Sequence, residues 1–153
     1  MEEKIEIKLK HGLNELKFGL STGGVKKILG NPDDTELDED SENKTEIWYY
    51  WEHGITVFFD YAEDKRCTCL ETENIDATLL GKPLSELKEA DIKELFTKNG
   101  YKDFETEDEE WGERRISVND AVVDIYFDNG EIVSVNWGVD YDDDEKPLWP
   151  RNE

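Results

Sequence analysis

Carboxylates are the side chains of this sequence that could do chemistry, because they far outnumber every other reactive group. The sequence holds 40 Asp and Glu residues against 18 Lys and Arg, two His and two Cys, and its formal net charge is −22. Three runs without a Lys or Arg, at residues 33–42, 103–110 and 140–145, hold 18 of the acids, so the rest of the chain carries only −4. Acids clustered in this way indicate a directed field and a cationic partner, whereas scattered acids would indicate solubility alone.

Paired carboxylates suit acid–base catalysis only where a pocket shifts their pKa values, and these runs are typical of solvated segments. His11 and His53 lie in expected turns, and neither belongs to a Cys or Ser pattern that indicates a nucleophile with its base. The sequence has no phosphate-binding glycine loop, nucleophile elbow or zinc-type spacing of Cys and His. We therefore expect no catalytic residues and interpret the protein as not an enzyme.

The last acidic run partly matches a calcium-binding motif. Asp140, Asp142 and Asp144 match the first three ligand positions of an EF-hand loop. Glu145 and Arg151 stand at the sixth and twelfth positions, where the motif requires Gly and Glu. The sequence therefore predicts no metal site, and nothing in it indicates a cofactor.

The elements that would position the acids follow from hydrophobic periodicity. Leu, Ile, Val and Phe make up about a quarter of the chain, which is above the roughly 20% typical of disordered chains. The first half predicts a strand at 4–10, a short strand at 16–18, a helix capped by Ser21 or Thr22 and stopped by Gly30 and Pro32, an acidic loop, and strands at 46–51, 55–61 and 66–71. The second half predicts a helix at 88–99, a second acidic loop, and strands at 114–118, 121–127 and 131–137.

The two halves repeat this order at regular offsets. Val25 and Ile92 are 67 residues apart, and Gly30 and Gly100 are 70 apart. We therefore predict an α+β fold in which two tandem repeats, each a helix plus an antiparallel meander, form a sheet with helices on one face. The expected divisions are 1–76 for the N-terminal hairpin and first repeat, 77–139 for the second repeat, and 140–153 for an acidic C-terminal tail. In that tail, Leu148 and Trp149 could dock on the body or on a partner.

Alternation sorts the strand residues into two faces. A two-residue turn at Asn119-Asp120 pairs Val118 with Ala121. One side then receives Ile116, Val118, Ala121, Val123, Ile125, Phe127, Val133, Val135 and Trp137; the other receives Arg115, Ser117, Val122, Asp124, Tyr126, Ile132, Ser134 and Asn136. In the first half, the same pattern puts Cys67 and Cys69 inside as small core residues, on one side of a strand where a mutual disulfide is awkward. Two unpaired cysteines suit a reducing compartment.

The aromatic strand at 46–51 leaves two alternatives. A three-residue turn after it buries Tyr49 and Trp51 and exposes Trp48 and Tyr50, whereas a two-residue turn does the reverse. In either case large aromatics reach the second face of the sheet, with Phe58 and Tyr126. Such a face is typical of a protein-binding surface, unless the N-terminal hairpin or the tail covers it.

Part of the first half resembles a known bacterial pattern. Residues 18–32 read FGLSTGGVKKILGNP, and IWYY at 47–50 and GITVFFD at 54–60 follow. This segment is similar to the small repeat of β-lactamase-inhibitor-protein-like domains and of small outer-membrane assembly lipoproteins. The resemblance implies a short helical segment on an antiparallel sheet and, in the inhibitor, tandem repeats that block an enzyme with a sheet face and loops. No apolar leader and no lipidation Cys lie near the N-terminus of the given sequence. We therefore expect a cytoplasmic protein without an envelope role, or a chain whose leader has been removed.

The small size and strong acidity also resemble bacterial immunity proteins, which neutralise toxins. We expect a non-catalytic module that binds a basic protein, most plausibly an immunity protein or inhibitor in the cytoplasm. The alternative is a scaffold or accessory domain whose acids serve only solubility. Repulsion from phosphates excludes nucleic acid and anionic membranes as partners. The candidate partner-binding residues are Asp33, Asp34, Glu36, Asp38, Glu39, Asp40, Trp48, Tyr50, Phe58, Glu107, Asp108, Glu109, Glu110 and Tyr126.

Overall fold

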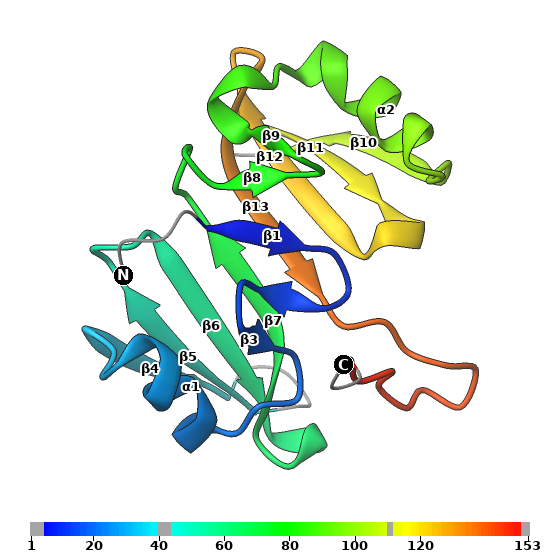
Figure 1. Ribbon diagram of the computed structural model, residues 1–153. Coiled ribbons are helices and arrows are strands. Elements are labelled where there is room, and N and C mark those ends of the chain that lie inside the picture. The colour runs from blue at the N-terminus through cyan, green and yellow to red at the C-terminus, as the bar shows by residue number, and fades with distance from the viewer. Residues whose placement is uncertain (1–4, 40–43, 110–111, 151–153) are drawn as a thin grey trace.

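A computed structural model of the chain describes residues 5–39, 44–109 and 112–150, and in these residues the fold is α+β (Figure 1). The larger of its two sheets is antiparallel throughout. Its eight strands, in spatial order, are β10 (Phe104–Asp108), β11 (Arg114–Val118), β12 (Val123–Asp128), β13 (Glu131–Gly138), β7 (Arg66–Thr72), β6 (Ile55–Asp60), β5 (Thr45–Tyr50) and β4 (Asp34–Asp38).

The smaller sheet has five short strands, which the sequence analysis identified only in part. In spatial order they are β3 (Leu16–Lys17), β2 (Gly12–Leu13), β1 (Glu6–Lys8), β8 (Thr78–Leu79) and β9 (Lys82–Pro83). The pairing of β1 with β8 is parallel and joins segments about 70 residues apart. The remaining elements are α1 (Thr22–Leu29), α2 (Glu89–Lys98) and the 3₁₀ turns η1 (Tyr61–Glu63), η2 (Leu84–Glu86) and η3 (Asn119–Ala121).

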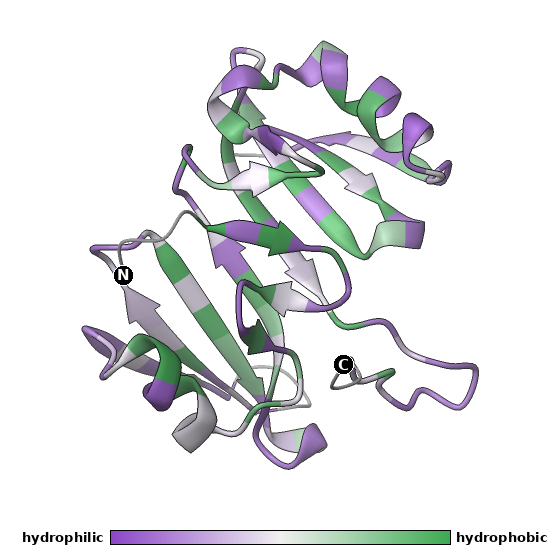
Figure 2. Ribbon diagram, viewed as in Figure 1, coloured by the Kyte–Doolittle hydropathy of each residue, from purple (hydrophilic) through white to green (hydrophobic). Residues whose placement is uncertain are grey.

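One face of the eight-stranded sheet forms the core. Figure 1 shows α1, α2 and the five-stranded sheet in front of it, and Figure 2 shows apolar and polar bands alternating along its strands. Trp137 on the central strand β13 is fully buried, and its indole Nε1 donates to the Gly12 carbonyl at 2.9 Å. This bond ties the two sheets together. The buried residues that the covering elements contribute to the core include Leu13, Leu16, Val25, Leu79, Ile92 and Phe96.

The helix termini follow the expected capping rules. Ser21 caps α1, because its hydroxyl accepts from the Gly24 amide at 3.3 Å, and α1 ends before Gly30 at φ 82°. At the start of α2, the Lys88 amide donates to the Asp91 carboxylate at 3.0 Å. Both predicted helices are confirmed to within about a residue or two at each end.

Two β-bulges correct the predicted faces. Phe58 pairs with Cys69 but Phe59 pairs with Cys67, so Thr68 is an extra residue in β7. Cys67 is therefore buried in the core while Cys69 lies on the opposite face, and the prediction that both point inward is wrong. A second bulge at Val133 shifts the pairing in the same way. It buries Ile132, which was expected outside, and leaves Val133 half-buried.

The aromatic strand is also corrected. Tyr50 pairs with Ile55, which leaves a four-residue connection at 51–54. Because four and two are both even, the side chains alternate as they would with the two-residue turn. Trp48 and Tyr50 are only 4% and 3% exposed, so the expectation that they lie on the surface is wrong. Trp51 is the exposed residue, at 65%.

The first two acidic runs were expected as loops, and this is wrong as well. Much of each run is a strand, β4 or β10, and these two strands are the edges of the eight-stranded sheet. Acidic residues are well suited to this position, because charge on an edge strand prevents pairing with another molecule. In the C-terminal segment, Trp149 packs on Gly19, whereas Leu148 is exposed.

Candidate functional site

The candidate site is the face of the eight-stranded sheet opposite the helices, here called the open face. Register joins one residue of each strand into a central row across the sheet. The row is Asp34, Tyr49, Thr56, Glu71, Asn136, Asp124, Ser117 and Glu105. Partial rows beside it hold Glu36, Ile47, Phe58 and Cys69 on the β4–β7 half, and Ser134, Tyr126, Arg115 and Glu107 on the β13–β10 half.

Hydrogen bonds hold the polar side chains at the middle of the central row. The Ser117 hydroxyl donates to Asp124 Oδ1 at 2.5 Å, and the Cys69 thiol donates to Asn136 Oδ1 at 3.1 Å. Burial raises the pKa of the Glu71 carboxyl, and the charges of Glu73 and Glu113 add to this rise, while a hydrogen bond from Asn136 opposes it. These groups are therefore already partly desolvated before any partner arrives.

Arg115 is the single cationic side chain in these three rows. Its guanidinium forms ion pairs with Glu107 and, at 3.5 Å, with Glu109. Burial lowers the pKa of Arg115, but the charges of Glu107, Asp124 and Glu109 outweigh this and leave the pKa raised. Its positive charge is thus already compensated by neighbouring acids, and the potential of the open face is negative.

The acids of the two edge strands extend this negative charge. Asp34, Glu36 and Glu105 are exposed and point to the open face by register. Glu36 accepts a hydrogen bond of 3.4 Å from the Tyr49 hydroxyl. A polar and aromatic sheet surface therefore lies between two acidic borders.

The predicted partner-binding residues divide among several places. Those that register puts on the open face are Asp34, Glu36, Asp38, Phe58, Glu107 and Tyr126. Asp33 accepts from the Trp51 amide at 2.9 Å, Glu39 pairs with Lys44 at 3.3 Å, and Glu109 pairs with Arg115. Asp108 pairs with Arg114 at 3.3 Å on the helix side. Trp48 and Tyr50 belong to the core, and Asp40 and Glu110 lie outside the described residues.

The residues at the middle of the open face were not among the predicted partner-binding residues. Alternation did assign Asp124 and Asn136, with Arg115 and Ser117, to the second side of the sheet, and this is confirmed. Isolated polar residues in strands carry no motif, whereas the acidic runs stand out by composition alone. Glu71 could have been found by the same alternation in the first half.

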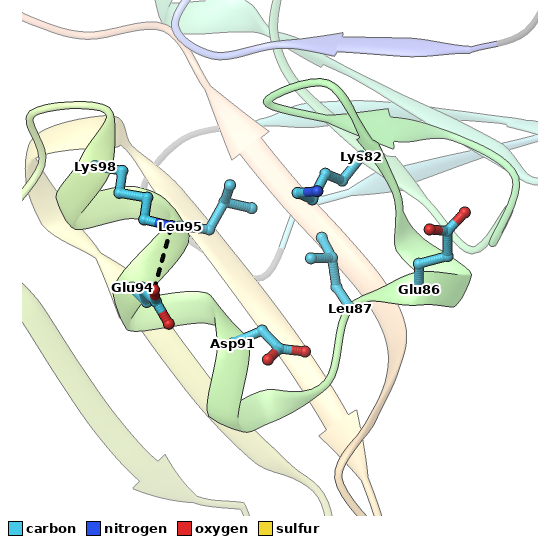
Figure 3. A pocket seen from close by; sticks show the side chains of 7 residues that line it. All are labelled: Lys82, Glu86, Leu87, Asp91, Glu94, Leu95 and Lys98. Carbon is cyan, nitrogen blue, oxygen red and sulfur yellow. Dashed lines mark ion pairs between the residues drawn. The ribbon is translucent and has the colours of Figure 1, made fainter.

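Hollows on the described surface include one on each side of the sheet. The first, about 310 Å³, lies between α2 and the β9–η2 segment (Figure 3). Charges of both signs line it, and Lys98 pairs with Glu94 at 3.2 Å, so it favours no ligand of one charge. The second, about 400 Å³, lies on the open face at Cys69, Asp124, Asn136 and Gly138.

Both cysteines of the chain lie in the described residues, and neither forms a disulfide there. Burial raises the pKa of the Cys67 thiol strongly and that of Cys69 to about 12, so neither thiol is an activated nucleophile. In the described parts of the chain, no group of three or more His, Cys, Asp or Glu side chains is placed to hold a metal ion. None of the helices in those parts is long and apolar enough to cross a membrane.

Comparison with known proteins gives one structural similarity. No family model matches the chain, and no curated protein matches it. The fold is similar to the crystal structure of an extracellular protein containing an SCP domain from Bacillus anthracis str. Ames, with a TM-score of 0.51 and 13% identity. The match covers 92% of this chain and 49% of the other, so this chain spans about half the length of the protein it resembles. At this identity the similarity concerns the fold alone.

Proposed function

We propose that this protein is a non-catalytic module that binds a basic protein on its open face and acts as its inhibitor, as an immunity protein does for a basic toxin or enzyme. One observation carries the proposal. The acidic strands β4 and β10 border a sheet face that lies opposite both described helices. An acidic border of this kind attracts a cationic partner and orients it over the face between the two edges.

The dimensions of the open face fit such a partner. Eight strands at a spacing of about 4.8 Å give a width of about 34 Å, and strands of this type are about 17–20 Å long. The resulting area is about 600–700 Å², close to the roughly 800 Å² that each protein contributes to an interface of standard size. Tyr49, Phe58 and Tyr126 are half-buried on this face and offer aromatic contact area.

A second function is favoured by the position of the acids on edge strands. Charge there prevents edge-to-edge association of the sheet, whatever the protein binds. Under this alternative, the protein is a scaffold or accessory domain whose acids serve only solubility. Neutralising Asp34 and Glu36 by Asn and Gln would then leave the binding of any partner unchanged while promoting self-association.

The experiment begins with capture of the basic partner from the host lysate, followed by purification of that partner and measurement of its association rate at several salt concentrations. We expect the association rate to fall with salt while the dissociation rate changes little. The test variant is Glu36→Lys with Glu105→Lys on the open face, and the control is Glu15→Lys with Glu86→Lys, two exposed residues elsewhere on the molecule.

Both double variants change the net charge equally, so only the position of the charges differs. We expect the open-face variant to slow association roughly tenfold or more and the control to change it by less than about threefold. Equal effects of the two variants, or a complex that disappears at moderate salt, would refute the proposal in favour of nonspecific attraction.

We also propose that the two halves of the chain are tandem repeats of one unit. Both halves contain a short hairpin, a helix and four antiparallel strands in the same order, β2–β3–α1–β4–β5–β6–β7 and β8–β9–α2–β10–β11–β12–β13. The last strands of the two halves, β7 and β13, pair with each other at the middle of the large sheet. An arrangement of this kind supports a duplicated unit, and it gives the open face its two matching acidic borders.

A further inference from the structure

We propose that the hollow on the open face at Gly138 is an anchor pocket that receives one Lys or Arg side chain of the basic partner. This inference rests on the proposed function and deepens it, because it names the group of the partner that the open face recognises. It rests on the shape of the hollow, on the chemistry of its walls and on the charges around it.

The shape of the hollow follows from backbone features. Gly138 pairs with Cys69 across β13 and β7, and its amide donates to the Val122 carbonyl at 3.1 Å. A Cβ at Gly138 would lie 3.1 Å from the Thr68 carbonyl oxygen and 3.8 Å from Val122 Cγ1. A side chain at residue 138 would therefore be tight against the backbone of β7 and would narrow the hollow that Gly138 lines. The volume of the hollow, about 400 Å³, is enough for one long side chain.

The walls of the hollow suit a long cationic side chain. Val122 and Gly138 offer apolar surface, and Tyr141 offers an aromatic ring. The stems of Lys and Arg pack on apolar surface while their charged ends seek an acceptor or the face of a ring. No Lys or Arg is among the residues that line the hollow.

Asp124 is the ionisable acceptor of the pocket. Its carboxylate accepts one hydrogen bond from Ser117, and a carboxylate offers about four acceptor sites, so acceptor capacity remains for a ligand. The side-chain amide of Asn136 is already engaged, because its oxygen accepts from Cys69 and it hydrogen-bonds to Glu71. The described lining holds no group of carboxylates placed to bind a metal ion, which favours an organic cation.

Charges beyond the lining add to the attraction. Burial raises the pKa of the Tyr141 hydroxyl, and the negative charges of Asp60 and Glu63 raise it further. The positive charge of Arg115 interacts with Asp124 and opposes this attraction, but Arg115 also pairs with Glu107 and Glu109. The pocket thus lies in a negative field to which several carboxylates contribute. A cation entering it would be stabilised by Asp124 directly and by the others at longer range.

The first test uses Nα-acetyl-lysine methylamide as the probe and records ¹H–¹⁵N spectra of the whole protein. We expect saturable shifts at the amides of Asp124, Asn136 and Gly138 at about millimolar probe, and none with the Nε-acetylated derivative, which has no charge. Asp124→Asn keeps an acceptor for Ser117 but removes the charge, and it should weaken probe binding roughly tenfold or more.

The matched control is Asp128→Asn, which removes an exposed carboxylate of the same strand four residues away and should leave binding within about twofold. Gly138→Ala, which narrows the space without changing charge, should also weaken binding. Shifts that persist in Asp124→Asn would overturn the inference. So would probe-induced shifts of equal size at the residues of the two acidic edge strands, β4 and β10. So would shifts of the same size with the uncharged derivative.

The second test separates this inference from the proposed function. If the purified partner binds Asp124→Asn as tightly as the wild type but loses affinity for the Glu36→Lys, Glu105→Lys variant, the open face is the interface and the pocket is not its anchor. If neither variant affects the partner, the proposed function fails, and the lysine probe still decides whether the pocket takes a cation.

Discussion

Two neighbouring tryptophans test the assignment of the two sheet faces. Trp48 is 4% exposed, its ring centroid lies 4.7 Å from that of Phe59, and its Nε1 donates to Glu46 at 2.5 Å. Trp51, three residues later, is 65% exposed in the turn after β5. We expect Trp48→Ala to destabilise the protein strongly and Trp51→Ala to have almost no effect.

The magnitude follows from the buried area. A Trp side chain buries roughly 200 Å², and at about 25 cal/mol per Å² this contributes about 5 kcal/mol to folding. Truncation of a buried Trp to Ala typically costs about 3–5 kcal/mol, so we expect a loss of about 4 kcal/mol for Trp48→Ala. At about 2–4 °C per kcal/mol for a chain of this size, the melting temperature should fall by about 8–16 °C. Trp51→Ala should stay within about 0.5 kcal/mol of wild type.

Urea unfolding followed by far-UV circular dichroism is the suitable assay, because removing a Trp changes the fluorescence baseline. Both variants keep the backbone amide of residue 51, which donates to Asp33 at 2.9 Å, so the turn retains its hydrogen bond. A loss of more than about 2 kcal/mol for Trp51→Ala, or of less than about 1 kcal/mol for Trp48→Ala, would refute the assignment of the faces.

Three further predictions concern the backbone, the thiols and the pH dependence. Gly12→Ala should prevent folding or cost more than about 3 kcal/mol, because its Cβ would lie 1.9 Å from a backbone oxygen at φ +147°. Gly81→Ala, at φ +85° with nothing within 4 Å, should cost only about 1–2 kcal/mol in thermal melts. Cys67 and Cys69 should react with a disulfide reagent at pH 8 at least about a hundredfold more slowly in the native state than in urea, since burial raises both pKa values; equal rates would contradict this. Because the pKa of Glu71 is raised on folding, the folded state binds its proton more tightly, and this stabilisation is lost as pH rises above the unfolded value of about 4.3. The stability of Glu71→Gln relative to wild type should therefore increase with pH between about 4.3 and the raised pKa of Glu71 in the folded protein. A difference in stability that does not depend on pH would show that folding does not raise this pKa.

Local sequence was enough to predict most elements and one of the sheet faces. Alternation assigned Ile116, Val118, Ile125 and Trp137 to the buried side, and all four are buried. The predicted turn of two residues is in fact a connection of four, because Val118 pairs with Val123. The assignment of faces survived this error because both lengths are even, and alternation depends only on parity.

The errors arose where a single extra residue or a distant partner decides the outcome. The bulges at Thr68 and Val133 reverse the faces of their strands, and no composition marks them, because a bulge depends on how two strands fit together. The parallel pairing of Ile7 with Leu79 joins two-residue and three-residue strands that are too short to be recognised alone. Local propensity does not contain these long-range choices.

The sequence by itself determined the amount and clustering of negative charge, the two helices with a first cap at Ser21 or Thr22, and the alternation that separates a buried from an exposed side of the large sheet. These properties depend on residue type and on spacing within one element. The tertiary structure decided that the first two acidic runs largely form edge strands and that Trp48 is core. It also placed Glu71 and Asp124 in one row of the open face, on either side of Asn136, with a hollow at Asp124 that Gly138 lines. These results depend on register between strands far apart in the chain, and register is settled only when the two sheets and both helices pack around one core.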